Sequence, residues 1–163
     1  MSKLGSPYRE ILEKLVECLK REFKLVSVVV YGSVARGTAG RDSDIDILII
    51  AENLPNRYLR FKMFEKAEKC VEKDLEELRR KGFNLFLSPI IKSVEEARRI
   101  TPLYLDMVED AVILYDKNDF FQNILSRLKR RLRELGAKRV WLGKKWYWVL
   151  KKDYKFGEVI NIE

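Results

Sequence analysis

The stretch from residue 28 to residue 50 reads Val28-Val-Val-Tyr-Gly-Ser-Val-Ala-Arg-Gly-Thr-Ala-Gly-Arg-Asp-Ser-Asp-Ile-Asp-Ile-Leu-Ile-Ile50. One β-branched apolar run ends at Gly32 and a second begins at Ile45, which predicts two buried strands joined by a polar loop. Residues two apart on a strand share a face, so Asp44 and Asp46 point the same way and the alternate isoleucines fill the opposite face. Two neighbouring ionised carboxylates repel each other unless a cation lies beside them. The stretch therefore favours a cation site at the start of the second strand.

The same residues favour a site for a nucleoside triphosphate. Mg²⁺ binds to one or two carboxylates together with substrate phosphates and water, which suits Asp44 and Asp46. Gly32 and Ser33 are small, so the backbone N–H groups of their turn can approach phosphate oxygens. This combination is typical of phosphoryl transfer assisted by a metal. A common turn followed by an acidic surface loop remains the alternative interpretation.

This stretch resembles the signature of the minimal nucleotidyltransferases, in the DNA polymerase β-like superfamily. The signature is a Gly-Ser pair, ten intervening residues and an Asp-x-Asp between apolar strand residues. The resemblance spans residues 7–115 and implies an α/β (α+β) fold, a mixed β-sheet flanked by helices. It also implies Mg²⁺-dependent transfer of a nucleoside monophosphate from ATP or another nucleoside triphosphate to a protein or RNA hydroxyl group. In one branch of the family, such proteins are antitoxins that adenylylate a tyrosine of a small helical toxin protein.

The resemblance also implies roles for individual residues. The site would have two catalytic, metal-binding carboxylates, two turn residues that meet the triphosphate, and an arginine that neutralises its charge: Asp44 and Asp46, Gly32 and Ser33, and Arg36 or Arg41. The family places a third carboxylate on the next core strand, where this chain has Asn84, a candidate metal ligand. An amide cannot accept a proton, so the alternative function is a catalytically weak or inactive module that binds a nucleotide or a partner. The spare acids Asp106, Glu109 and Asp110 are expected to be exposed.

Residue periodicity predicts the remaining elements. Apolar residues at helical spacing predict helices over 7–23, 58–80, 93–100, 103–108 and 119–135. Apolar runs predict strands over 83–91 and 111–115, and the pattern around Gly143 predicts a β-hairpin over 139–150. We expect residues 1–116 to form the nucleotidyltransferase domain, and residues 117–163 to form a basic C-terminal extension, a helix and a β-hairpin, packed on it.

The net charge of +8 belongs to the C-terminal part of the chain. Residues 127–155 carry twelve basic side chains and two acidic ones, interspersed with Trp141, Trp146, Tyr147 and Trp148. Basic residues follow phosphates and aromatic rings stack on bases, so contact with RNA or DNA is one hypothesis. An acidic protein partner is a second. In a third, Trp146 and Trp148 share a hairpin face that packs on the helix over 119–135.

Composition excludes several kinds of site. The chain has no histidine, which rules out catalysis by a Ser-His relay and zinc binding by imidazole. Cys18 and Cys70 both fall in helical patterns and are expected to be buried thiols without a disulfide. No apolar run is long enough to cross a bilayer, so we expect no membrane contact and a cytoplasmic location.

Overall fold

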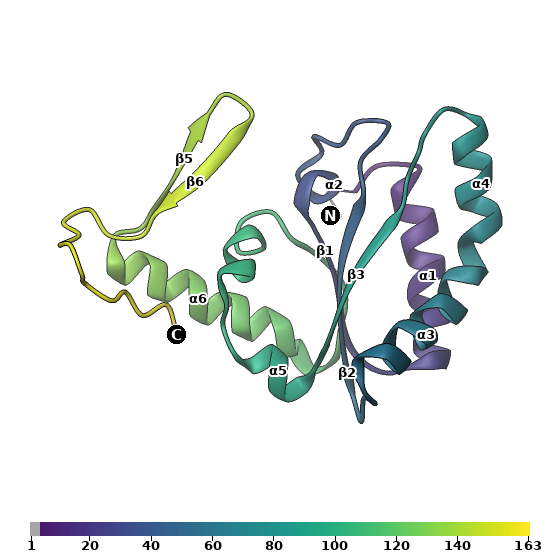
Figure 1. The fold of residues 1–163 in the computed structure, drawn as a ribbon, viewed down its shortest axis with the longest axis horizontal. Coiled ribbons are helices and arrows are strands. Elements are labelled where there is room, and N and C mark those ends of the chain that lie inside the picture. Colours follow the sequence, from purple (N-terminus) through teal and green to yellow (C-terminus); the bar gives the residue numbers. More distant parts are fainter. Residues whose placement is uncertain (1–3) are drawn as a thin grey trace.

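Four strands form one mixed sheet in the order β3-β2-β1-β4 in the computed structural model, which describes residues 4–163 (Figure 1). The two central strands are antiparallel to each other, β2 is parallel to β3, and β4 is antiparallel to β1. The strands are β1 (Lys24–Tyr31), β2 (Ile45–Glu52), β3 (Leu87–Ser93) and β4 (Val112–Asp116). The predicted mixed sheet flanked by helices is confirmed.

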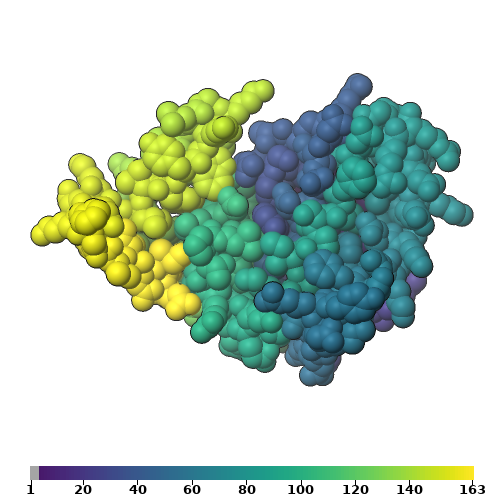
Figure 2. Space-filling view, in the orientation of Figure 1, coloured from purple at the N-terminus to yellow at the C-terminus, as the bar shows by residue number. Residues whose placement is uncertain are grey.

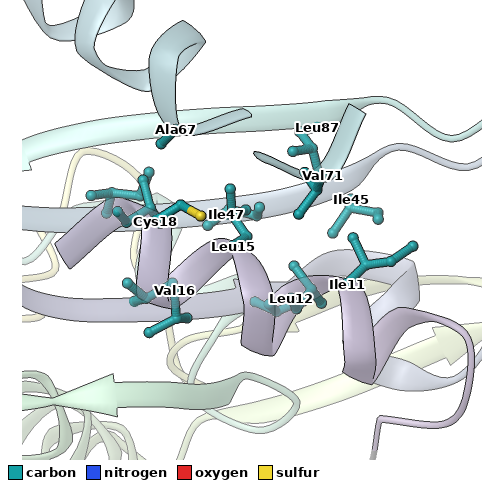
Figure 3. Packing of buried hydrophobic residues seen from close by; sticks show 14 of the residues in the cluster. Ile11, Leu12, Leu15, Val16, Cys18, Ile45, Ile47, Ala67, Val71 and Leu87 are labelled. Atoms are coloured by element: carbon teal, nitrogen blue, oxygen red, sulfur yellow. The ribbon is translucent and has the colours of Figure 1, made fainter. Parts of the chain in front are cut away.

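Helices cover one face of the sheet, on the right in Figure 1: α1 (Tyr8–Glu22), α3 (Arg57–Glu68) and α4 (Glu72–Arg80), with the 3₁₀ helix η1 (Lys69–Val71) between the last two. The helix predicted over 58–80 is therefore interrupted. In Figure 3, Leu15 of α1 lies beside Ile47 of β2, and Ile11 of α1 lies beside Ile45. Alternate residues of β2 thus enter this core, as the strand period requires.

A disulfide joins α1 to η1, and it overturns the expectation of two separate thiols. Cys18 and Cys70 are bonded, with their Cα atoms 6.6 Å apart. Periodicity placed each cysteine on the buried side of its own helix. It carried no information that these two helices pack against each other, because the cysteines are 52 residues apart in the sequence.

A second hydrophobic core lies between the opposite face of the sheet and three helical segments: α5 (Val94–Arg98), the 3₁₀ helix η2 (Pro102–Asp106) and α6 (Phe120–Leu135). The 3₁₀ helix η3 (Lys117–Asp119) leads into α6. Tyr31, Leu48 and Ile50 reach this core from β1 and β2. Tyr104 and Phe121 meet edge to face, with ring centroids 5.3 Å apart. The face of β2 that carries Asp46 is therefore the face turned toward α6 and η2.

The third strand begins four residues later than predicted. Residues 83–86 precede the strand. Pairing with β2 begins where the N–H of Ile45 donates to the carbonyl of Phe86, at 2.8 Å. Pro89 is tolerated within β3 because this strand lies at the edge of the sheet and pairs only with β2.

The hairpin at the C-terminal end stands apart from the four-stranded sheet (Figure 1). Its strands are β5 (Lys138–Leu142) and β6 (Lys145–Val149), close to the predicted hairpin. Trp148 packs on the core beneath α6, and its indole Nε1 donates to the carbonyl of Leu105 at 3.2 Å. Within the part of the chain that the structure covers, no helix is both long and apolar enough to cross a membrane.

Candidate active site

Gly32, directly after β1, lies against Asp46 of β2. Gly32 follows Tyr31, which lies opposite Asp46 in the strand register. Its φ of +72° is in the left-handed region, and a Cβ built on it would lie 2.3 Å from Oδ2 of Asp46. Only glycine leaves room for that carboxylate. The Gly-Ser and Asp-x-Asp motifs therefore touch in the fold. The contact places the carboxylate of Asp46 over the turn where α2 (Gly32–Arg36) begins.

Asp46 is half-buried and feels the charge of its neighbour Asp44, which is exposed. Burial raises the pKa of Asp46 above its usual range, and the carboxylates of Asp44 and Asp106 raise it further, while Arg36 opposes them. Concentrated negative charge of this kind is relieved by a cation. Carboxylate oxygens are the hard ligands that Mg²⁺ prefers, and two of them leave coordination positions for phosphate oxygens and water. The donor set therefore fits a divalent cation.

The two candidate arginines lie in different places. Arg36 ends α2, and its charge lowers the pKa of both Asp46 and Asp106, so it lies near the acids. Arg41 instead has its guanidinium carbon 5.8 Å from the centroid of the Phe83 ring, at the connection that enters β3. The structure brings Arg36 to the acidic pair and places Arg41 against the neighbouring loop.

Asn84 is not on the third strand, contrary to the expectation. It precedes β3, its backbone N–H donates to the carbonyl of Arg41 at 2.8 Å, and its side-chain Nδ2 donates to Asp42 at 2.8 Å. The residue of β3 opposite Asp46 is Ser88. The error comes from the late start of β3, which leaves Asn84 in the connection before the strand.

Asp106 is one of two acids whose exposure the sequence predicted wrongly. It is half-buried at the end of η2 rather than exposed, between Tyr104 and Met107, which lie in the core beneath α6. Burial raises its pKa, against the opposing charge of Arg36. Burial also raises the pKa of Tyr31 to about 12, with further contributions from Asp46 and Asp106. No spacing rule in the sequence indicates that η2 returns to the start of β2, where Asp46 lies.

The other two spare acids have separate partners. Asp110, also expected to be exposed, is largely buried in an ion pair with Arg139 of the hairpin. Glu109 is exposed, as expected, and lies 3.8 Å from the ammonium nitrogen of Lys129. Among residues 4–163, no group of three carboxylate, thiol or imidazole side chains forms a ready metal cluster.

Known proteins resemble this chain over most of its length. Residues 12–115 match the profile of the nucleotidyltransferase domain family. A relative from Methanocaldococcus jannaschii, the candidate protein adenylyltransferase MJ1305, is 36% identical over 124 residues, which is 73% of this chain and 79% of the relative. Another candidate protein adenylyltransferase of that organism, MJ1379, is 32% identical over 97 residues, 58% of this chain and 94% of the relative. A crystal structure of a toxin–antitoxin complex with AMP-PNP aligns with a TM-score of 0.46 and 20% identity, covering 76% of this chain and 90% of the matched chain.

Proposed function

The chain belongs to the nucleotidyltransferase domain family, and from that premise we propose that it transfers a nucleoside monophosphate from a nucleoside triphosphate to a protein hydroxyl group. The observation that carries the proposal is the 2.3 Å approach of Asp46 to the Cβ position of Gly32, which joins the acidic pair to the Gly-Ser turn. The names of the relatives support a protein acceptor and an adenylyl group.

In the proposed reaction, the acceptor oxygen forms a bond to the α-phosphorus. The bond from that phosphorus to the oxygen bridging to the β-phosphate breaks, and pyrophosphate leaves with the electron pair. Asp44 and Asp46 would hold Mg²⁺, which when bound neutralises phosphate charge and stabilises the attacking and leaving oxygens. Gly32 and Ser33 would hold the triphosphate by the N–H groups of their turn, and Arg36 would balance its charge.

Asp106 is our candidate for the group that receives the hydroxyl proton. It lies on the face of the sheet that carries Asp46, and both Asp46 and Tyr31 feel its charge. Burial raises the pKa of its carboxyl group, which makes the ionised carboxylate a stronger proton acceptor. With this role, Asp106→Asn would keep the affinity for the triphosphate and lose transfer.

Other features of the proposal rest on the sequence alone. Binding of metal by Asn84, binding of phosphate by Arg41 and a cytoplasmic location stay predictions. A small helical toxin-type protein is a candidate acceptor by the family resemblance. Contact between the basic extension and RNA or DNA also stays a prediction, and affinity that fell steeply with added salt would support it.

Transfer is tested with each of four α-³²P-labelled nucleoside triphosphates, Mg²⁺, and separated protein and RNA fractions as acceptors. We expect label on protein with ATP, and none with the double variant Asp44→Asn/Asp46→Asn. Asp42→Asn removes an acid of the same loop and should leave labelling intact. Label on RNA would show that the acceptor is RNA and not protein. Equal labelling by the double variant would show that Asp44 and Asp46 are not catalytic.

A further inference from the structure

The hairpin turns one of its two faces toward the candidate active site. In the register of β5 and β6, Trp141 lies opposite Trp146 and Arg139 lies opposite Trp148, so all four side chains share this face. Figure 1 places the hairpin beside α2, and Figure 2 shows an open notch between the two. We refer to Arg139, Trp141 and Trp146 as the aromatic wall.

The aromatic wall is anchored to the body of the protein at its base. Arg139 donates to both carboxylate oxygens of Asp110, and the two side chains are only 17% and 15% exposed. The indole N–H of Trp148 donates a hydrogen bond to the carbonyl of Leu105 in η2. The guanidinium carbon of Arg139 then lies 5.0 Å from the ring centroid of Trp141 and 5.4 Å from that of Trp146. An arginine at this range holds an indole by cation–π attraction.

The aromatic wall also reaches the acidic pair, through Arg36. The guanidinium carbon of Arg36 lies 5.9 Å from the ring centroid of Trp146. Arg36 is the arginine whose charge acts on Asp46 and Asp106. The wall therefore borders the place where the triphosphate would lie. Of its two indoles, Trp141 is 46% exposed although it is on the inward face of the hairpin. Packing on the core beneath α6 accounts for Trp148, whereas the ring of Trp141, held by Arg139, stays open to solvent over nearly half of its surface.

We propose that the aromatic wall binds the nucleobase of the nucleoside triphosphate by stacking, an inference that rests on the proposed function. A triphosphate held by Gly32, Ser33 and Arg36 has one planar, uncharged part, its base. Indole faces stack on any nucleobase, and arginine planes add cation–π attraction. Arg36 would turn to the phosphates and leave the ring of Trp146 open to the base. The wall lies beyond residues 12–115, so it adds a base-binding surface to the family domain.

The test compares ligands with and without a base. Binding of ATP and of inorganic tripolyphosphate, each with Mg²⁺, is measured by calorimetry for the wild type, Trp141→Ala and Trp146→Ala. The control is Tyr147→Ala, because Tyr147 is 47% exposed on the opposite face of the same hairpin, matching Trp141 at 46%. Stacking on one aromatic ring changes affinity by about five-fold to a hundred-fold. We expect that loss for ATP with both tryptophan variants, no change for tripolyphosphate, and no change for either ligand in Tyr147→Ala.

Each other outcome overturns the inference in a distinct way. Equal losses for ATP and tripolyphosphate would mean that Trp146 serves only to hold Arg36. Unchanged ATP binding with reduced transfer would assign the wall to the acceptor. A wild type that binds neither ligand would contradict the proposed function itself. If a tryptophan variant fails to fold, the unmodified protein still decides, because stacking requires ATP to quench tryptophan fluorescence and tripolyphosphate to leave it unchanged.

Discussion

Replacing Gly32 with alanine should leave the protein folded, with reduced stability, and should weaken its binding of ATP with Mg²⁺. Alanine at a φ of +72° costs about 1–2 kcal/mol, because its Cβ crowds the carbonyl oxygen in the left-handed region. The new Cβ would also lie 2.3 Å from Oδ2 of Asp46, so this carboxylate must turn away. Moving a side chain off its preferred rotamer adds about 0.5–1.5 kcal/mol. The total loss of folding free energy is therefore about 1.5–3.5 kcal/mol.

Gly37 provides the matched control. Its φ is +75°, and a Cβ built on it would meet nothing within 4 Å. Gly37→Ala therefore carries the same backbone cost without displacing Asp46. For a chain of this size each 1 kcal/mol lowers Tm by about 2–4 °C, so both variants should melt several degrees below the wild type.

Binding of ATP with Mg²⁺, measured by calorimetry well below both melting temperatures, gives the decisive comparison. We expect Gly32→Ala to lose about ten-fold to a hundred-fold in affinity, the size of loss seen when the support of a metal ligand is disturbed. Gly37→Ala should bind like the wild type. If the two variants bind ATP equally well, the contact between Gly32 and Asp46 does not build the site, and our reasoning is wrong.

Three further predictions concern stability. The Cys18–Cys70 bond closes a loop of 52 residues, so its reduction should lower the free energy of unfolding by about 4 kcal/mol. Dithiothreitol should therefore lower Tm by about 10 °C, and an equal Tm with and without reductant would contradict this. Burial raises the pKa of Asp106, so its ionised form destabilises the fold as the pH rises through that pKa. Asp106→Asn should therefore raise Tm by a few degrees at pH 7, and this gain should shrink toward pH 4. A gain in Tm that grew toward acid pH would contradict a raised pKa of Asp106. Ser93→Ala breaks the capping box with Glu96 and should cost about 1 kcal/mol without changing ATP affinity, which denaturant unfolding and calorimetry can check together.

Much of the fold could be predicted because its signals are local. The strand residues around Asp46 alternate between the two cores as their period requires, and α6 ends close to the predicted boundary at Leu135. The Gly-Ser turn and the Asp-x-Asp pair are also close in sequence, so their meeting across two adjacent strands follows from the strand pairing itself.

The features that escaped prediction all depend on packing between distant segments. Cys18 meets Cys70 only because two helices lie side by side, and Asp106 reaches the acidic pair only because η2 returns to that end of the sheet. The predicted position of Asn84 was wrong because β3 begins only at Leu87, which leaves Asn84 in the connection that precedes the strand. The hairpin was recognised, but the side toward which Trp146 points depends on its ion pair and hydrogen bond to the body of the protein.

A crystal structure with Mg²⁺ and a non-hydrolysable ATP analogue tests the central claim most directly. We predict one cation bound to carboxylate oxygens of both Asp44 and Asp46, with triphosphate oxygens accepting hydrogen bonds from the turn at Gly32 and Ser33. A nucleotide seated on another surface, with these two aspartates free of metal, would contradict the account.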